Sequence, residues 1–216
     1  MSSSSPSRPV PRKELILERA ERHFAEHGFQ GASLSAIARD CGVGNPSLLH
    51  HFPSKEVLYR AVLERQADEL AAHMGQWAAN GARDSGGLRA RLLTFVTLQL
   101  EWMDARPTGA KLLIRELMDN AERIQQAQTR PLEGFLRGSL ALMEEAQSAG
   151  VVRREISAAV ILTIILGALN YAKIARPTFS KAFPEPALKS ETAWMDMVAR
   201  DVLSMVMVSV DHARAD

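Results

Sequence analysis

The chain has 216 residues, of which 46% are hydrophobic, and this composition excludes a largely disordered protein. Its formal net charge is only +1, so overall charge does not indicate a nucleic-acid partner. The single cysteine, Cys41, excludes an intramolecular disulfide and a cysteine-rich zinc site, and it suits a reducing cytoplasm.

The first segment, residues 1–11 (MSSSSPSRPVP), is rich in Ser and Pro and lacks apolar periodicity. We interpret it as a flexible basic arm. With Arg8, Arg12 and Lys13 and no acid before Glu14, the arm could lie along phosphates or enter a minor groove. The alternative is a solvated tail, which is the commoner role of such segments.

Residues 12–60 predict a group of short helices. A first helix spans about 12–27, because Ile16, Ala20 and Phe24 recur at four-residue spacing, and Gly28 follows where a left-handed residue ends a helix. A second helix begins near Ser33, which is a favourable N-cap. Its inward-facing residues are expected to be Leu34, Ile37, Ala38 and Cys41. Gly42 then supplies a sharp turn.

A third helix follows the turn directly. It starts at Asn45-Pro46, with Asn45 expected as the N-cap, because proline is favoured at the first helical position. Leu48 and Phe52, four residues apart, are expected to point inward, and Ser54 is expected to cap a fourth helix. The stretch 33–55 therefore predicts a helix-turn-helix, which fits one helix into the major groove of DNA.

The rest of the chain also predicts helices. They are expected at 54–77, 88–104, 107–118, 121–148, 156–175 and 188–212, with loops at 80–87 and 176–187 and a kink at Pro131. The longest apolar run, 158–169, is shorter than the ~20 residues that cross a bilayer, and the N-terminus lacks an apolar signal sequence. We therefore expect an all-α cytoplasmic protein of about nine helices with no membrane partner.

The order of these residues resembles the DNA-binding domain of TetR-family transcriptional regulators. The resemblance covers roughly residues 12–60 and depends on Ile37-Ala38, Gly42-Val43, Phe52 and Lys55 at their mutual spacings. It implies a helix-turn-helix DNA-binding domain at 12–60 and a helical regulatory and dimerisation domain at 61–216. The chain departs from the family pattern where an aromatic residue, often Tyr, is usual, because it has Leu49 and His51 there. It also has Gly44 where Ser is frequent and Asn45-Pro46 in place of a common Lys-Gly pair.

The expected DNA contacts lie on the third helix and at the starts of its neighbours. Asn can pair with adenine, Ser and His suit base edges or phosphates, and Leu49 can meet a thymine methyl group. Lys55 resembles the phosphate-binding lysine of the family. The predicted DNA-binding residues are Ser33, Ser35, Asn45, Pro46, Ser47, Leu49, His50, His51 and Lys55. Ser33 and Asn45 could instead act only as helix caps.

The resemblance further implies a ligand pocket and a homodimer. The candidate pocket residues are Met74, Trp77, Trp102, Met103, Met118, Phe135, Asn170 and Tyr171, a set that suits an apolar or aromatic effector. The last two long helices are expected to form a four-helix interface through Ile161, Ile165, Ala168, Trp194, Val198, Val202 and Met205. The alternative is that these two helices only complete the core of a monomer.

These patterns predict a ligand-responsive repressor that binds a palindromic operator in double-stranded DNA as a homodimer. We expect neither an enzyme nor a cofactor, because the chain lacks a phosphate loop and the HExxH and GxSxG motifs. The alternatives are a helical adaptor or an enzyme without recognisable motifs. We expect no metal at His50-His51 or His23/His27, and we expect Cys41 to be a buried apolar residue and not a redox sensor.

Overall fold

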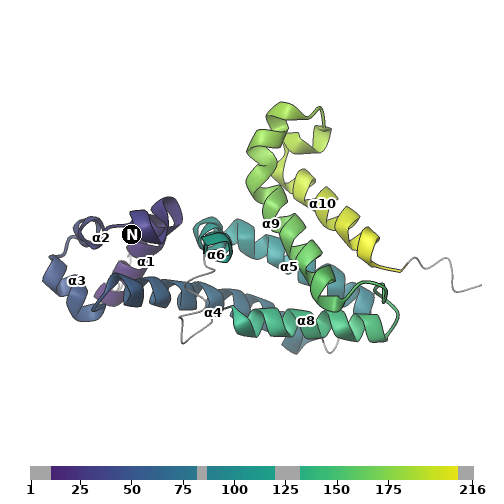
Figure 1. Cartoon of the computed structure of the whole chain (residues 1–216), viewed down its shortest axis with the longest axis horizontal. Coiled ribbons are helices and arrows are strands. Elements are labelled where there is room, and N and C mark those ends of the chain that lie inside the picture. Colours follow the sequence, from purple (N-terminus) through teal and green to yellow (C-terminus); the bar gives the residue numbers. More distant parts are fainter. Residues whose placement is uncertain (1–10, 82–86, 120–131, 209–216) are drawn as a thin grey trace, which may run out of the picture. The chain divides into compact units, whose positions relative to one another are not determined.

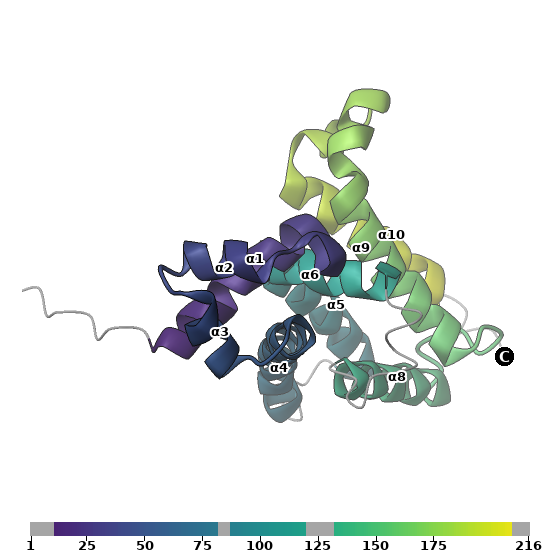
Figure 2. The same ribbon diagram turned by 60° about the vertical axis from the view of Figure 1, so that its left-hand side comes forward.

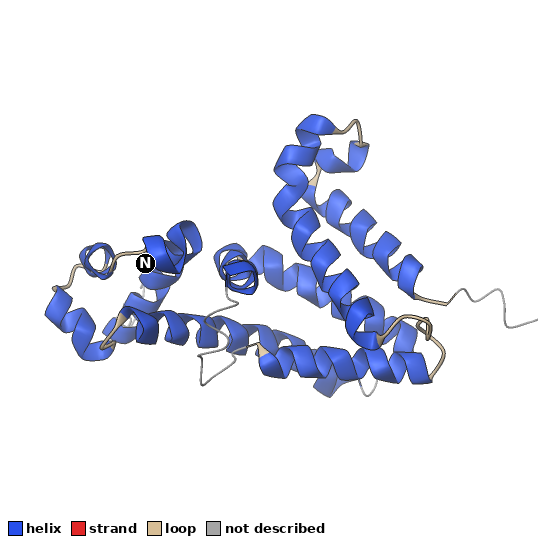
Figure 3. Cartoon of the chain, in the orientation of Figure 1, coloured by secondary structure: helices blue, strands red, loops and turns tan. Residues whose placement is uncertain are grey.

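The computed structural model describes residues 11–81, 87–119 and 132–208, with the side chains of 75–81 and 119 left out of the description (Figure 1). The predicted arm, most of the loop at 80–87, the start of the helix expected at 121–148, Pro131 and the chain after 208 lie outside these residues. Across the described ranges the chain forms nine α-helices and a single 3-10 turn, with no strand (Figure 3). The all-α prediction is therefore confirmed.

The chain divides into two compact units. The N-terminal unit comprises the described residues of Met1–Glu69 and Arg106–Pro131, and the C-terminal unit comprises those of Leu70–Ala105 and Leu132–Asp216. The N-terminal unit contains α1 (Arg12–Gly31), α2 (Leu34–Asp40), α3 (Asn45–His51), the first part of α4 (Lys55–Gly81) and α6 (Pro107–Asp119). The C-terminal unit contains the rest of α4, α5 (Gly87–Ala105), α8 (Glu133–Ser148), α9 (Ala158–Ala182), the 3-10 turn η1 (Pro186–Lys189) and α10 (Glu191–Val206).

The first helix breaks where the sequence predicts. Gly28 has φ of 69°, a left-handed conformation that glycine adopts readily, and one further helical turn follows it to Gly31. The side chains predicted to face the core on α1 and α2 are buried, with Ile16, Phe24 and Ile37 fully so. Leu34 is only half-buried. These apolar side chains fix α1 and α2 against each other.

Helix α6 completes the N-terminal unit, and it lies alongside α1 (Figure 2). Tyr59 Oη of α4 donates a hydrogen bond of 2.6 Å to Glu116 of α6. At Gly109 the α6 backbone comes so close to α4 that a Cβ atom there would lie 1.9 Å from Gln66 Oε1. A larger residue at position 109 would therefore require the buried Gln66 side chain to move.

A buried polar cluster lies beside this contact. Gln66 is fully buried, and its Nε2 donates a 2.9 Å hydrogen bond to Glu21 of α1. Arg65 donates a second hydrogen bond to the same carboxylate. Burial raises the pKa of the Glu21 carboxyl, and the hydrogen bond from Arg65 opposes that rise. The cluster therefore joins α1 to α4 at a position where either charge alone would be costly to bury.

In the C-terminal unit, α9 and α10 lie side by side, while α8 packs on α9 and α5 packs on α10 (Figures 1 and 2). The ammonium group of Lys173 on α9 makes ion pairs with Asp104 of α5 and Glu191 of α10. The Trp194 indole N–H donates to the carbonyl oxygen of Ala172 at 3.1 Å. These polar contacts supplement an apolar core in which Ile161, Ile165 and Leu203 are almost completely buried.

The predicted loop at 176–187 is wrong in its first half, because α9 continues through Pro177 to Ala182. Proline removes one helical hydrogen bond, but tertiary packing holds this turn. The Phe179 ring contacts the rings of Tyr171, Phe183 and Trp194, with centroids 4.9–6.4 Å apart. Helix α10 is also shorter than predicted and ends at Val206, after which Met207 forms an isolated antiparallel bridge with Val152.

We predict that Gly109→Ala destabilises the protein by about 1–3 kcal/mol, the usual range for overpacking a filled interior. Gln66 could make room only by breaking its bond to Glu21. The matched control is Gly138→Ala on α8, where a Cβ atom meets nothing within 4 Å. There, alanine should be neutral or should add up to about 1 kcal/mol of helix propensity. Urea unfolding followed by circular dichroism measures both, and equal stabilities of the two variants would contradict the close contact.

Candidate nucleic-acid interface

The turn between α2 and α3 sets the direction of the third helix. Gly42 has φ of 65°, and the N–H of Val43 donates to the Ala38 carbonyl oxygen at 2.9 Å. Leu48 and Phe52 are buried, as the four-residue spacing predicts. With those two side chains inside, the opposite face of α3 is directed to solvent.

That outer face carries the residues predicted to bind DNA. Leu49 is 40% exposed, so this face also offers an apolar group to solvent. Ser47 and His51 are half-buried at the sides of the face. The exposed predicted residues of α3 are Asn45, Pro46, Leu49 and His50. The face therefore combines amide, imidazole and apolar groups that suit base edges in a major groove.

Asn45 does not cap α3, and this expectation is corrected. Gly44 occupies the N-cap position with an extended backbone, while Asn45 is the first helical residue and Pro46 the second. Asn45 Nδ2 donates instead to Ser35 Oγ of α2 at 2.8 Å. The bond ties the starts of α2 and α3 together and holds both side chains at the solvent-facing edge of the turn.

Ser33 has the extended backbone of an N-cap, but its hydroxyl accepts no capping hydrogen bond. Its exposed side chain therefore stands at the start of α2, where helix N–H groups attract anions. Ser54, in contrast, does cap its helix, because its Oγ accepts from the N–H of Val57 at 3.3 Å. The hydrogen bond with the Ser54 side chain, followed by backbone bonding, lowers the pKa of Glu56 in the same turn.

Lys55 has a structural contact that the sequence did not predict. Its Nζ donates to the carbonyl oxygen of Gln30 at 3.1 Å and lies 4.8 Å from the centre of the Phe29 ring. Both interactions hold the start of α4 against the end of α1. The cation is half-buried, so any contact with a phosphate would come from a side chain that is already oriented.

Four histidines of the N-terminal unit lie in two neighbouring pairs, His23 with His27 and His50 with His51. The rings of His50 and His51 have centroids 5.6 Å apart in an edge-to-face arrangement. His23 Nε2 lies 3.4 Å from Asp40, and His27 Nε2 lies 3.7 Å from Glu26. Over the described ranges, no three His, Cys, Asp or Glu side chains converge on one point as a metal ion requires.

The candidate ligand residues are scattered. Met74, Trp102 and Met103 are buried in the C-terminal unit, and Phe135 and Asn170 are half-buried there. Met118, on α6 of the N-terminal unit, is 76% exposed and Tyr171 is 64% exposed, so neither lines an apolar interior. The side chain of Trp77 lies outside the described residues.

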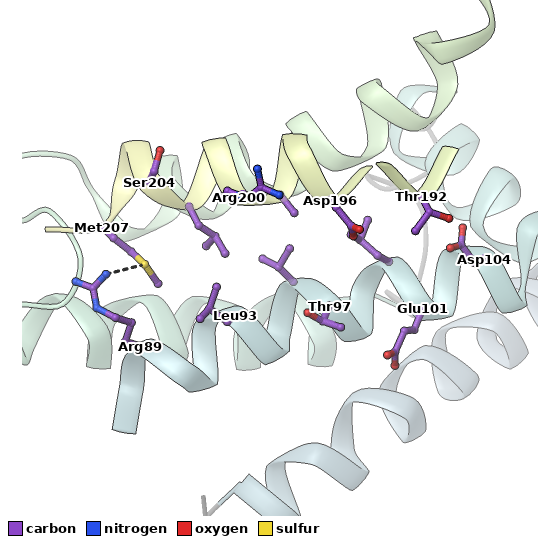
Figure 4. Close-up of a pocket in the computed structure, with 14 residues that line it drawn as sticks. Arg89, Leu93, Thr97, Glu101, Asp104, Thr192, Asp196, Arg200, Ser204 and Met207 are labelled. Carbon is purple, nitrogen blue, oxygen red and sulfur yellow. Dashed lines mark hydrogen bonds between the residues drawn. The ribbon is translucent and has the colours of Figure 1, made fainter. Parts of the chain in front are cut away.

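A groove of about 590 Å³ lies elsewhere in the C-terminal unit, between α5 and α10 (Figure 4). Leu93 and Thr97 of α5 lie opposite residues of α10 that include Asp196. At one end of the groove, the Arg89 guanidinium donates a hydrogen bond to the Met207 sulfur at 3.4 Å. None of the eight predicted ligand residues lines this groove. Sequence periodicity could not have located it, because it arises from the contact of two helices distant in the chain.

The predicted dimer residues belong partly to the protomer's own core. Ile161, Ile165 and Val202 are buried inside the C-terminal unit, so their assignment to an interface is corrected. Ala168, Trp194 and Val198 are half-buried, whereas Met205 is 65% exposed. The solvent side of α9 carries a different apolar set: Val160, Ile164, Tyr171 and Ile174. The sequence missed this set because α9 is apolar nearly all round, so periodicity did not distinguish its two sides.

Comparison with known proteins identifies this arrangement of helices. Residues 16–62, which include α2, the turn and α3, match the model of bacterial regulatory proteins of the tetR family. This part of the chain is a tetR-family DNA-binding domain. The match ends at residue 62, within α4.

Two relatives are bacterial HTH-type transcriptional regulators. The HTH-type transcriptional regulator RutR of Escherichia coli K12 is 30% identical over 132 residues, which are 61% of this chain and 60% of RutR. The HTH-type transcriptional repressor AcnR of Corynebacterium efficiens is 37% identical over 71 residues, which are 33% of this chain and 38% of AcnR. The chain thus spans less than two thirds of the length of these curated relatives.

Solved structures share the whole fold. SCO4942 from Streptomyces coelicolor has a TM-score of 0.68 at 22% identity, covering 91% of this chain and 98% of its own. The ketosteroid transcriptional regulator KstR2 of Mycobacterium tuberculosis has a TM-score of 0.67 at 18% identity. The match covers 94% of this chain and 98% of the KstR2 chain. The TetR-like fold therefore extends over both units, well beyond residue 62.

We predict that Cys41, which lies within the tetR-family domain, reacts slowly with thiol reagents. Cys41 is buried, and burial, followed by the charge of Asp40, raises the pKa of its thiol. The reactive thiolate should therefore form at higher pH in the folded protein than in the unfolded chain. Reaction with dithionitrobenzoate across pH 7–10, with and without urea, measures both profiles on the one thiol. Equal rates would mean that Cys41 is accessible.

Proposed function

We propose that the protein is a transcriptional regulator that binds operator DNA through α3, acts as a homodimer and is released by a small-molecule effector. The observation that carries the proposal is the solvent-exposed outer face of α3 on a TetR-family helix-turn-helix scaffold. This face has no packing partner in the N-terminal unit, yet it carries Leu49 beside hydrogen-bonding groups. A major groove supplies both thymine methyl groups and base-edge donors and acceptors.

Each polar residue has a distinct part in the proposed complex. Asn45 and His50 face outward and would contact base edges, and Asn45 would do so while held by Ser35. Ser33 and Ser35 stand at the start of α2, where phosphate oxygens would meet helix N–H groups. Lys55, already fixed by Gln30, would add a positive charge near the backbone. Base contacts would select the sequence and phosphate contacts would set the register.

A single seven-residue helix reads too few base pairs for useful selectivity, so the proposal includes a homodimer whose two α3 helices read half-sites about 34 Å apart. The exposed side of α9 supports this. Val160, Ile164, Tyr171 and Ile174 recur at spacings of four, seven and three residues, which places them along one stripe. By length and composition α9 could also cross a membrane, but its opposite side is built into the core of the C-terminal unit. A second copy of α9 would cover the stripe.

The proposed effector acts on the C-terminal unit and lowers DNA affinity. A ligand shifts the equilibrium only by its differential affinity for the two states, typically 1–3 kcal/mol. Such a regulator would act in the cytoplasm, where its operator is. Repression is favoured over activation because the relative AcnR is itself a transcriptional repressor.

We predict that His50→Ala and Asn45→Ala each weaken binding to the selected operator by about 1–3 kcal/mol and weaken binding to scrambled DNA far less. Each change removes a base contact and leaves the phosphate contacts in place. The operator is first obtained by selecting random DNA fragments on the wild-type protein, and gel-shift titrations then measure both affinities.

The matched control for these two variants is Arg137→Ala. Arg137 is exposed on α8 of the C-terminal unit and pairs only within its own helix, with Glu133. Its removal should leave both affinities unchanged. Equal losses on operator and scrambled DNA for His50→Ala and Asn45→Ala would reject their assignment as base-reading residues.

We predict that Ile164→Asp converts the dimer to a monomer, because a carboxylate at the centre of the α9 stripe would be desolvated in the interface. Leu93→Asp is the control, since Leu93 is similarly exposed in the same unit but lies on α5. Analytical ultracentrifugation at micromolar concentration measures the mass of each variant. If the Ile164→Asp protein stays dimeric, the exposed side of α9 does not form the dimer interface.

A further inference from the structure

The inner side of α5 combines an apolar surface with two polar groups. Phe95, Gln99, Trp102 and Met103 follow spacings of four, three and one residues, so they lie on one side of the helix. All four are buried, and Gln99 and Trp102 are only 5% and 4% exposed. A glutamine at the centre of such a surface is uncommon, because its amide must be hydrogen-bonded to be buried without a penalty.

One polar atom of each residue has no hydrogen-bond partner among the described residues. The Oε1 atom of Gln99 and the Nε1 atom of Trp102 are fully covered, and neither makes a hydrogen bond to any described residue. The same unit shows how such groups are normally accommodated. The Trp194 indole donates to Ala172, and Gln147 donates to the carbonyl oxygens of Arg153 and Ile156. His73 Nε2 on α4 also makes no hydrogen bond to a described residue, but the two atoms on α5 differ from it in lying three residues apart on one buried helix face.

The surroundings of these groups define the chemistry of a matching ligand. The Phe95 ring stacks with that of Phe135 on α8, with centroids 6.4 Å apart and planes 14° from parallel. The inner face of α5 carries no charge. The nearest acids along the helix lie on other sides, where Glu101 is 4.0 Å from His73 and Asp104 pairs with Lys173. A charged ligand would find no counter-ion on this face, so a neutral one is favoured.

We infer that the inner face of α5 binds a neutral, largely apolar or aromatic molecule that carries a carboxamide or lactam group. The Trp102 indole, which can only donate, would donate to the ligand's carbonyl oxygen. Gln99 would accept from the ligand's N–H, and its amide can turn over to meet the opposite arrangement. The inference rests on the proposed effector-controlled function and names the chemical class of that effector.

The test compares glutamine-to-leucine variants at two positions of the full-length protein. Gln99→Leu removes an orphaned polar group and keeps the side-chain size, so the ligand-free protein should melt at a higher temperature, by about 2–4 °C. Gln147→Leu is the matched control, because Gln147 is hydrogen-bonded and its replacement should lower the melting temperature. A Gln99→Leu variant that melts lower, as the control should, would show that Gln99 is a satisfied structural residue and would overturn the inference.

Binding is measured by calorimetry without DNA, using 1-naphthamide and 1-methylnaphthalene as probes of matched apolar size. The wild-type protein should bind the amide at least about tenfold tighter, the equivalent of one good hydrogen bond. Gln99→Leu and Trp102→Phe should each remove that preference, whereas Gln147→Leu should keep it. Equal affinity of the wild-type protein for both probes, or no binding of the amide, would overturn the inference.

Operator binding by ligand-free Gln99→Leu separates this inference from the proposed function. It should match that of the wild-type protein, because Gln99 lies in the C-terminal unit. If the wild-type protein prefers the amide but binds no specific DNA, the ligand site stands and the proposed regulatory function falls. If the wild-type protein binds an operator but has the same affinity for both probes, this inference is wrong and the proposed function is unaffected.

Discussion

The burial of Leu48 and Phe52 is the constraint on which the proposed DNA-binding surface depends. A seven-residue helix such as α3 is not stable by itself in water, because too few hydrogen bonds offset the cost of nucleation. These two side chains attach α3 to the core of the N-terminal unit, and the left-handed Gly42 sets the direction from which it enters. The polar residues on the outside are consequently presented on a fixed helix, to which Asn45 adds its hydrogen bond with Ser35.

The N-terminal unit could be predicted well from sequence because its signals are local. Four-residue spacing located the buried side of α1, and glycine located both the break at Gly28 and the turn at Gly42. The errors came where a tertiary contact replaced a local preference. Asn45 was expected to cap its own helix, but Ser35, ten residues away, accepts its hydrogen bond. Lys55 likewise contacts Gln30, which no pattern of spacing indicates.

For the C-terminal unit, the sequence predicted helices correctly but not all of their bounds or which side chains are buried. The number and type of helices followed from periodicity, but α9 passes through Pro177 because the ring of Phe179 packs against three other aromatic rings. Since α9 is apolar on nearly all sides, the sequence could not separate its core-facing Ile161 and Ile165 from its solvent-facing Ile164. Gln99 was missed for a related reason, because one glutamine among apolar residues gives no periodic signal.

Because α6 belongs to the N-terminal unit, the two units alternate along the chain. The polypeptide passes from one unit to the other at three points, after residues 69, 105 and 131. A fragment that stops at residue 60 would lose α6, and with it the Tyr59–Glu116 bond and the cover over one side of α1. The helix-turn-helix unit is therefore not formed by the start of the sequence alone. It is completed by a helix encoded some fifty residues later, so the two units are linked by covalent backbone more than once.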